Sequence, residues 1–260
     1  MAAAAKFPPG WRVVTAEAAG PLHLAGGGEN QDAHAYRRLG DGFVLAVADG
    51  AGSAAWSACG ARTAVAAACR VAEDLAGAPP RERSGWWDLR RRYVSRFLHT
   101  FDAWAAGLGR PPADLATTVL AVVAHPPAFL FVAVGDCFAV VEHAGGGTHL
   151  LLPPDAGPDD GAAVFLTSPG RAASLRAELL FDPAVTGLAL CTDGLVEPAL
   201  AAGRGPGGGR VLRAPQDFER YFSAFAGPEH SPALLTDRMH SPEFAAASAD
   251  DKTMVLAVRT

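Results

Sequence analysis

The sequence predicts an α+β fold in which helices stack on antiparallel β-sheets. Seven short apolar runs have the length and composition of buried strands, and two long segments repeat their apolar residues at helical spacing. Several of the apolar runs follow one another through short turns, as strands of antiparallel hairpins do. The runs are apolar throughout rather than alternating, so both faces of the sheets are expected to be covered.

The predicted strands, in chain order, span residues 42–48, 118–124, 128–134, 138–141, 164–166, 188–191 and 254–258. Three of them form the stretch LAVVA-HPP-AFLFVAV-GD-CFAVV, in which the HPP and GD turns each join two runs. We therefore expect consecutive antiparallel hairpins in this part of the chain.

Two helices are predicted from longer patterns. Residues 53 to about 75 are rich in Ala and contain neither Gly nor Pro after Gly60, and Ser53 or Ser57 could supply the N-cap. Residues 86 to about 108 place large aromatic and aliphatic side chains at helical spacing. Two shorter helices are expected near residues 215–225 and 231–239.

Two Gly/Pro-rich stretches, 143–161 and 203–209, are interpreted as long surface loops. Neither lies at a change in composition, and no internal repeat is found. The expectation is one domain over residues 1–260, in which residues 1–10 form a loosely ordered N-terminus.

The composition narrows the class of protein. The 260 residues are 50% hydrophobic and 19% charged, as in folded globular proteins, and the formal net charge is −5. That charge argues against a nucleic-acid partner, and no apolar run approaches the roughly 18 residues of a membrane span. The N-terminus has no apolar core of a secretory signal. The four cysteines form no CxxC pair, so free thiols in a reducing cytoplasm are expected.

Acidic residues recur at the ends of the predicted strands, often beside Gly. A single Asp-Gly pair is usually only a turn, and turn-forming Asp and Gly remain the alternative explanation. Strand ends that share one sheet edge would bring carboxylates together, and such carboxylates repel unless a cation lies between them. Mg²⁺ and Mn²⁺ prefer oxygen ligands, so the pattern favours a divalent-metal site. The acidic residues concerned are Asp32, Asp49, Asp136, Asp193, Asp250 and Asp251.

The order of these motifs resembles that of the bacterial metal-dependent protein phosphatases, the PPM family or type 2C. The matching stretches are ENQDAHA (29–35), VLAVADGAGSAAWSACGARTAV (44–65), LATTVLAVV (115–123), FVAVGDCFAVV (131–141), LALCTDGLVE (188–197) and ADDKTMVLAV (249–258). They occur in the family's order from residue 29 to the C-terminus, so the resemblance spans about nine-tenths of the chain. The resemblance implies a four-layer α-β-β-α sandwich, two antiparallel sheets flanked by helices, with two metal ions in a cleft at one end.

The resemblance also implies roles for individual residues. Asp49 matches the aspartate that bridges both metals, and Gly50 matches the glycine whose carbonyl binds one of them. Asp193 and Asp250 match the remaining direct ligands, and Asp32 matches the acidic residue next to the metal-bound water. Asp136 matches the aspartate that helps to hold a third, weaker metal in some members. The implied cofactors are two Mn²⁺ or Mg²⁺ ions, which activate a water for in-line attack on phosphorus.

The sequence departs from the family pattern at two functional positions. Gly27 stands where many members have an Arg that binds the substrate phosphate, and Ala51 stands where many have a His that is a candidate general acid. Gln31 and Asp251 replace the more frequent Glu and Asn. The family's substrate-flap region corresponds to about 145–180 here, and none of its arginines is assigned to phosphate binding.

The expected function is hydrolysis of phosphoserine and phosphothreonine by a metal-activated water, with Asp32, Asp49, Asp193 and Asp250 as the catalytic set. Two alternatives remain open at this stage: a phosphatase-like binding or regulatory module with little activity, and a phosphatase of small phosphate esters. The expected partner is a phosphorylated protein, together with a cognate Ser/Thr kinase. We expect no nucleic-acid or membrane partner, and a monomer.

Overall fold

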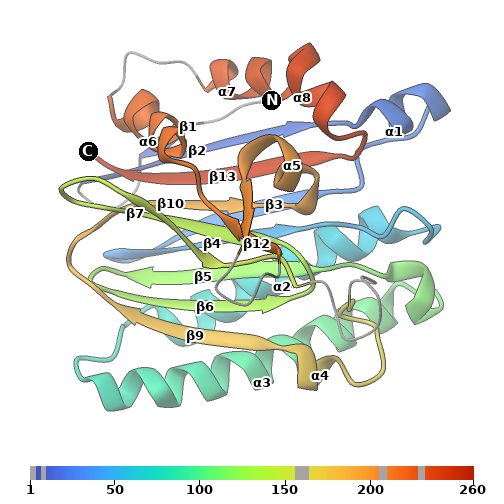
Figure 1. Cartoon of the computed structure of the whole chain (residues 1–260). Coiled ribbons are helices and arrows are strands. Elements are labelled where there is room, and N and C mark those ends of the chain that lie inside the picture. Colours follow the sequence, from blue (N-terminus) through green and yellow to red (C-terminus); the bar gives the residue numbers. More distant parts are fainter. Residues whose placement is uncertain (1–3, 7–9, 156–163, 205–209, 228–231) are drawn as a thin grey trace.

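The computed structural model describes residues 4–6, 10–155, 164–204, 210–227 and 232–260. Two antiparallel sheets lie face to face between two helical layers, which gives the four layers seen from top to bottom in Figure 1. This arrangement confirms the predicted α+β sandwich.

One sheet has six strands in the order β1-β2-β13-β10-β7-β8. These strands are β1 (Ala4–Lys6), β2 (Trp11–Ala18), β13 (Lys252–Arg259), β10 (Val185–Cys191), β7 (Phe138–His143) and β8 (Thr148–Leu152). All their pairings are antiparallel.

The other sheet has five strands in the order β3-β4-β5-β6-β9, again antiparallel throughout. These strands are β3 (Ala33–Leu39), β4 (Gly42–Ala48), β5 (Val119–His125), β6 (Ala128–Val134) and β9 (Arg176–Phe181). Every residue of β4, β5 and β6 is buried, as expected for a sheet covered on both faces.

The long helices α2 (Ser57–Ala76) and α3 (Arg83–Gly107) cover the five-stranded sheet. The helices α6 (Glu219–Ala226), α7 (Ala233–Met239) and α8 (Pro242–Ala247) cover the other sheet (Figure 1). A third apolar cluster fills the space between the two sheets. Within the described ranges, none of the helices combines the length and hydropathy that crossing a bilayer requires.

Short elements complete the described chain. They are α1 (Pro21–Gly26), α4 (Arg171–Ser174), α5 (Val196–Ala199), the 3₁₀ turns η1 (Pro112–Leu115), η2 (Asp193–Leu195) and η3 (Gln216–Phe218), and a hairpin of β11 (Ala201–Arg204) with β12 (Arg210–Arg213).

The predicted HPP hairpin is present, because β5 pairs with β6. The expectation of a second hairpin at the GD turn was wrong: β6 belongs to the five-stranded sheet, whereas β7 belongs to the six-stranded one. Gly135 has a φ of 93°, a conformation that a residue with a Cβ rarely adopts. The chain therefore crosses between the sheets at this turn and leaves Asp136 at the end of the sandwich.

Other local expectations were also wrong. Residues 164–166 form no strand. Neither serine caps α2, since Trp56 is its N-cap, without a side-chain hydrogen bond, and Ser57 is already helical. Strand β8 lies inside the stretch 143–161 that was expected to be a loop, and β11 includes the first two residues of 203–209. Residues 156–161 and 205–209 of these two stretches lie outside the described residues.

Candidate metal centre

Three aspartates from three different connections meet at one end of the sandwich. Asp49 follows β4, Asp136 lies in the turn between β6 and β7, and Asp193 follows β10. One carboxylate oxygen of each lies within 4.8 Å of the others, and all three residues are half-buried. The two sheets thus each deliver acidic groups to the same place.

Two threonines fix the backbone at Asp49. The Thr117 hydroxyl donates to the Asp49 carbonyl at 2.8 Å, and the Thr118 hydroxyl accepts from the Asp49 N–H at 3.1 Å. The Thr118 N–H also donates to the Asp49 carbonyl at 2.8 Å. Both threonines are fully buried, so these contacts hold Asp49 at a defined position.

The turn that carries Asp136 packs on the same Thr118. A Cβ at Gly135 would lie 2.5 Å from the Thr118 side chain, which leaves room only for glycine. On the other side, the Arg176 guanidinium donates to the Gly135 carbonyl at 2.8 Å and to the Pro153 carbonyl at 2.5 Å. Thr118 therefore connects the Asp49 backbone to the Asp136 turn.

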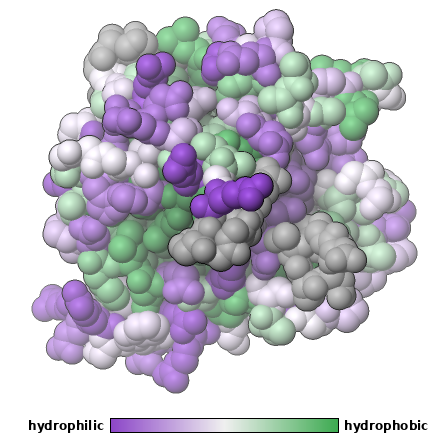
Figure 2. All heavy atoms as spheres, in the orientation of Figure 1, coloured by the Kyte–Doolittle hydropathy of each residue, from purple (hydrophilic) through white to green (hydrophobic). Residues whose placement is uncertain are grey.

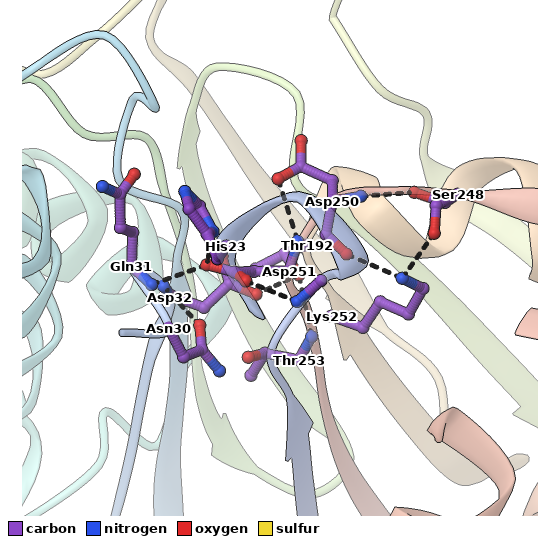
Figure 3. A network of polar contacts seen from close by, with 11 residues as sticks. His23, Asn30, Gln31, Asp32, Thr192, Ser248, Asp250, Asp251, Lys252 and Thr253 are labelled. Atoms are coloured by element: carbon purple, nitrogen blue, oxygen red, sulfur yellow. Dashed lines mark hydrogen bonds and ion pairs between the residues drawn. The ribbon is translucent and has the colours of Figure 1, made fainter. Parts of the chain in front are cut away.

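Asp32 lies in a buried polar network between the sheets (Figure 3). Its Oδ2 accepts a hydrogen bond from the Thr192 hydroxyl at 2.8 Å, and that hydroxyl accepts from the Thr253 N–H at 2.9 Å. Its own N–H donates to Asn30 Oδ1 at 2.8 Å. These bonds orient Asp32 from Thr192, which follows β10 and is itself held by β13, as well as from its own segment.

Asp251 joins the segment of Asp250 to the segment of Asp32 (Figure 3). Its carboxylate accepts from the N–H groups of Gly20 at 2.7 Å and Gln31 at 2.6 Å, and it lies 2.9 Å from His23 Nδ1. With only 2% of its surface exposed, Asp251 is a buried anchor for α1 and for the chain that leads to Asp32.

Lys252 holds the other side of that loop. Its buried ammonium donates to the carbonyls of Ser248 at 2.8 Å and Asp250 at 2.6 Å (Figure 3). The Asp250 carboxylate in turn accepts from the Asp251 N–H at 2.9 Å. Asp250 itself is exposed, so its side chain lies at the rim of the site.

The electrostatics of the site disfavour ionised carboxylates. Burial raises the pKa of Asp32 to about 7 against the opposing hydrogen bond from Thr192. Burial and the charges of Asp136, Asp250 and Asp32 raise the pKa of Asp193 to about 7. Burial, followed by the charges of the neighbouring aspartates, raises the pKa of Asp49 well above its usual range. Burial also raises the pKa of Asp136.

The donor set fits a hard divalent cation. Within the described part of the chain, Asp32 Oδ1 and Asp136 Oδ1 are buried and have no hydrogen-bond partner. Buried acceptors without partners are costly, and mutually repelling carboxylates raise that cost. A cation would satisfy both oxygens and the charge, and a site made only of oxygen donors suits Mg²⁺ or Mn²⁺.

The structure brings some of the predicted site residues into one tight group and leaves others outside it. Asp49, Asp193 and Asp136 form the tight group, although Asp136 was predicted only for a third, weaker metal. Asp32 and Asp250 lie outside that group, but the charge of each raises the pKa of Asp49. A Cβ at Gly50 would lie 2.8 Å from the Gln31 carbonyl oxygen, so the position tolerates only glycine.

The structure also shows where the two residues that depart from the family pattern lie. Gly27 is exposed and ends α1 with a φ of 69°, and Ala51 is buried beside Ala116. Neither residue has a side chain that could bind phosphate or donate a proton. Arg37 and Arg38 are exposed on β3, where Arg37 lies 3.8 Å from Glu73 and Arg38 donates to the Gly40 carbonyl.

Sequence reasoning missed two supporting groups. Thr192 directly precedes Asp193 in the CTDG motif, and a hydroxyl next to a strand-end aspartate was the available signal. The contact of His23 with Asp251 joins residues 228 positions apart, and no local pattern indicates such a pair.

Comparisons with known proteins identify the family and the fold. A family model described as protein phosphatase 2C matches residues 19–239. A search of curated proteins returns no match.

Solved structures share the fold at low sequence identity. The serine/threonine phosphatase PstP/Ppp of Mycobacterium tuberculosis is 18% identical with a TM-score of 0.65, over 96% of this chain and 99% of that one. The PstP catalytic domain in complex with two manganese ions is 19% identical with a TM-score of 0.65, over 96% and 98%. Stp1 of Staphylococcus aureus is 12% identical with a TM-score of 0.65, over 98% of both chains.

Proposed function

The chain belongs to the protein phosphatase 2C family, and on that premise we propose that it is a metal-dependent phosphatase of phosphoserine and phosphothreonine in proteins. The observation that carries this proposal is the convergence of Asp49, Asp136 and Asp193 within 4.8 Å, with buried carboxylate oxygens that lack partners beside them. The manganese-bound PstP domain, which has the same fold, supports two Mn²⁺ or Mg²⁺ ions as the cofactors.

We propose that Asp49, Asp193, Asp250, Asp32 and the carbonyl of Gly50 hold these ions. The position of Asp136 inside the tight group supports its use as a further ligand. When bound, such ions would neutralise charge on the phosphoryl oxygens and lower the pKa of water.

The protein's own groups prepare this site. Thr117 and Thr118 fix the backbone of Asp49, and Thr192 fixes one oxygen of Asp32 so that the other remains free for a ligand. Since Gly27 and Ala51 provide no polar side chain, substrate phosphate would depend on the ions, or on an arginine from elsewhere in the chain, for its neutralisation. We also propose that a cognate kinase supplies the phosphoprotein, that the protein acts as a monomer, and that it acts in the cytoplasm, where its four free thiols would stay reduced.

The sequence left two other functions as alternatives to this proposal. A binding module with little activity is favoured by the missing Arg and His, but a module without metal would keep repelling carboxylates at the cost of stability. A phosphatase of small phosphate esters would use the same centre, and only substrate preference separates it from the main proposal.

Turnover tests the proposal directly. Hydrolysis of p-nitrophenyl phosphate and of a phosphothreonine peptide is measured with Mn²⁺ and with a chelator. We expect Mn²⁺-dependent turnover of both substrates. Turnover of the small ester alone would favour a phosphatase of small phosphate esters. A folded protein that binds Mn²⁺ but hydrolyses neither substrate would favour the binding module.

A further inference from the structure

A groove of about 750 Å³ borders the carboxylate cluster, and its lining includes Asp136 and Asp193. This volume lies within the roughly 300–1,000 Å³ range of pockets that hold small ligands. Asp136 and Asp193 belong both to the carboxylate cluster and to the groove lining. A group bound at the cluster would therefore lie next to a group bound in the groove.

Three segments supply the rest of the lining: β8 with the residues after it, α5, and β12. Their lining residues are Leu150, Pro153, Pro154, Val196, Glu197, Val211 and Leu212. Six of these seven are apolar. Figure 2 draws the same face as Figure 1, and on it a hydrophobic area lies beside strongly hydrophilic side chains. Val211 is 49% exposed, so it offers apolar surface to a group bound in the groove.

The lining disfavours an acidic side chain even when ions are bound. Such ions would neutralise Asp136 and Asp193, which leaves Glu197 as the charged residue of the described lining, and that lining contains no basic side chain. An acidic side chain would be repelled by Glu197 and would lose hydration against the apolar residues, whereas an aliphatic one would bury apolar surface against β8 and β12.

We infer that this groove binds an aliphatic side chain of the phosphoprotein substrate, adjacent in its sequence to the phosphorylated residue. The inference rests on the proposed phosphatase function and adds a substrate preference to it: phosphosites with a neighbouring Leu, Ile or Val are favoured over sites with a neighbouring Asp or Glu.

The first test compares phosphothreonine peptides that carry Leu or Asp immediately before, or immediately after, the phosphothreonine. We expect kcat/KM with Mn²⁺ to be at least about tenfold higher for Leu at one of these two positions. Equal values at both positions would overturn the inference. Mn²⁺-dependent turnover of p-nitrophenyl phosphate is measured in parallel. If neither p-nitrophenyl phosphate nor any of the peptides is hydrolysed, the proposed function fails, and if the peptides are hydrolysed without preference, only the groove assignment fails.

The second test changes the groove. Val211→Asp should reduce the Leu-to-Asp ratio of kcat/KM severalfold, and the milder Val211→Ser should reduce it less. Leu234→Asp is the matched control, because Leu234 is also 49% exposed but lies on α7, outside the groove lining. The ratio should stay at the wild-type value in this control. An unchanged ratio in both Val211 variants, with native circular dichroism, would contradict the inference.

Discussion

Replacing Asp32 with Asn should remove a defined part of the pH dependence of stability in the metal-free protein. The pKa of Asp32 is raised from 3.8 to about 7 in the folded state. The folded protein therefore binds this proton more tightly than the unfolded chain does. The resulting stabilisation is complete below about pH 4 and is lost as the pH rises through 7. Between pH 5.5 and pH 8, Asp32 alone should account for a loss of about 2 kcal/mol.

The assay is urea unfolding with a chelator present, at pH 5.5 and at pH 8, for wild type and Asp32→Asn. The asparagine keeps an oxygen that can accept from Thr192 but does not titrate, so the difference between the two proteins reports the Asp32 carboxyl group together with its effect on the pKa of Asp49 and Asp193. We expect wild type to lose about 2 kcal/mol more than the variant between the two pH values. The same loss in both proteins, or a wild type that is more stable at pH 8, would refute the raised pKa.

Thr118→Val should lower the free energy of unfolding by about 1–3 kcal/mol, because it leaves the buried Asp49 N–H without its acceptor, and thermal unfolding would detect this. An unchanged melting temperature would show that the hydroxyl is not needed. Gly194→Ala would place a Cβ 1.9 Å from the Asp251 carbonyl oxygen, so we expect a loss of about 2 kcal/mol or more in urea unfolding. Gly26→Ala, which meets no atom within 4 Å, is its control and should leave stability nearly unchanged.

The sequence predicted those site residues that a short stretch of sequence can identify. Asp49, Asp136 and Asp193 each follow an apolar strand, and a carboxylate beside glycine at a strand end is visible in a short window. The contacts that hold these groups were not predictable in the same way. Thr118 reaches across 69 positions to Asp49, and Asp251 reaches across 220 to Gln31. Such pairs depend on how the strands are ordered in the sheets, which local patterns do not specify.

The fold likewise has elements that local patterns predict and elements that they do not. Continuous apolar runs predicted β4, β5 and β6, because a strand covered on both faces needs no polar residues. Strand β3 (AHAYRRL) was missed, since it is only partly buried and its polar residues hide the pattern. The GD turn was interpreted as a hairpin because both flanking runs are apolar, and nothing local distinguishes a tight turn within one sheet from a crossing between two.

The most direct test of the central claim is equilibrium dialysis of Mn²⁺ against wild type and Asp49→Asn, with turnover of p-nitrophenyl phosphate measured on the same samples. We expect wild type to bind two ions per chain, as in the manganese complex of PstP, and the variant to lose at least one ion together with Mn²⁺-dependent turnover. Equal Mn²⁺ binding and equal turnover in the two proteins would contradict a metal centre built on Asp49.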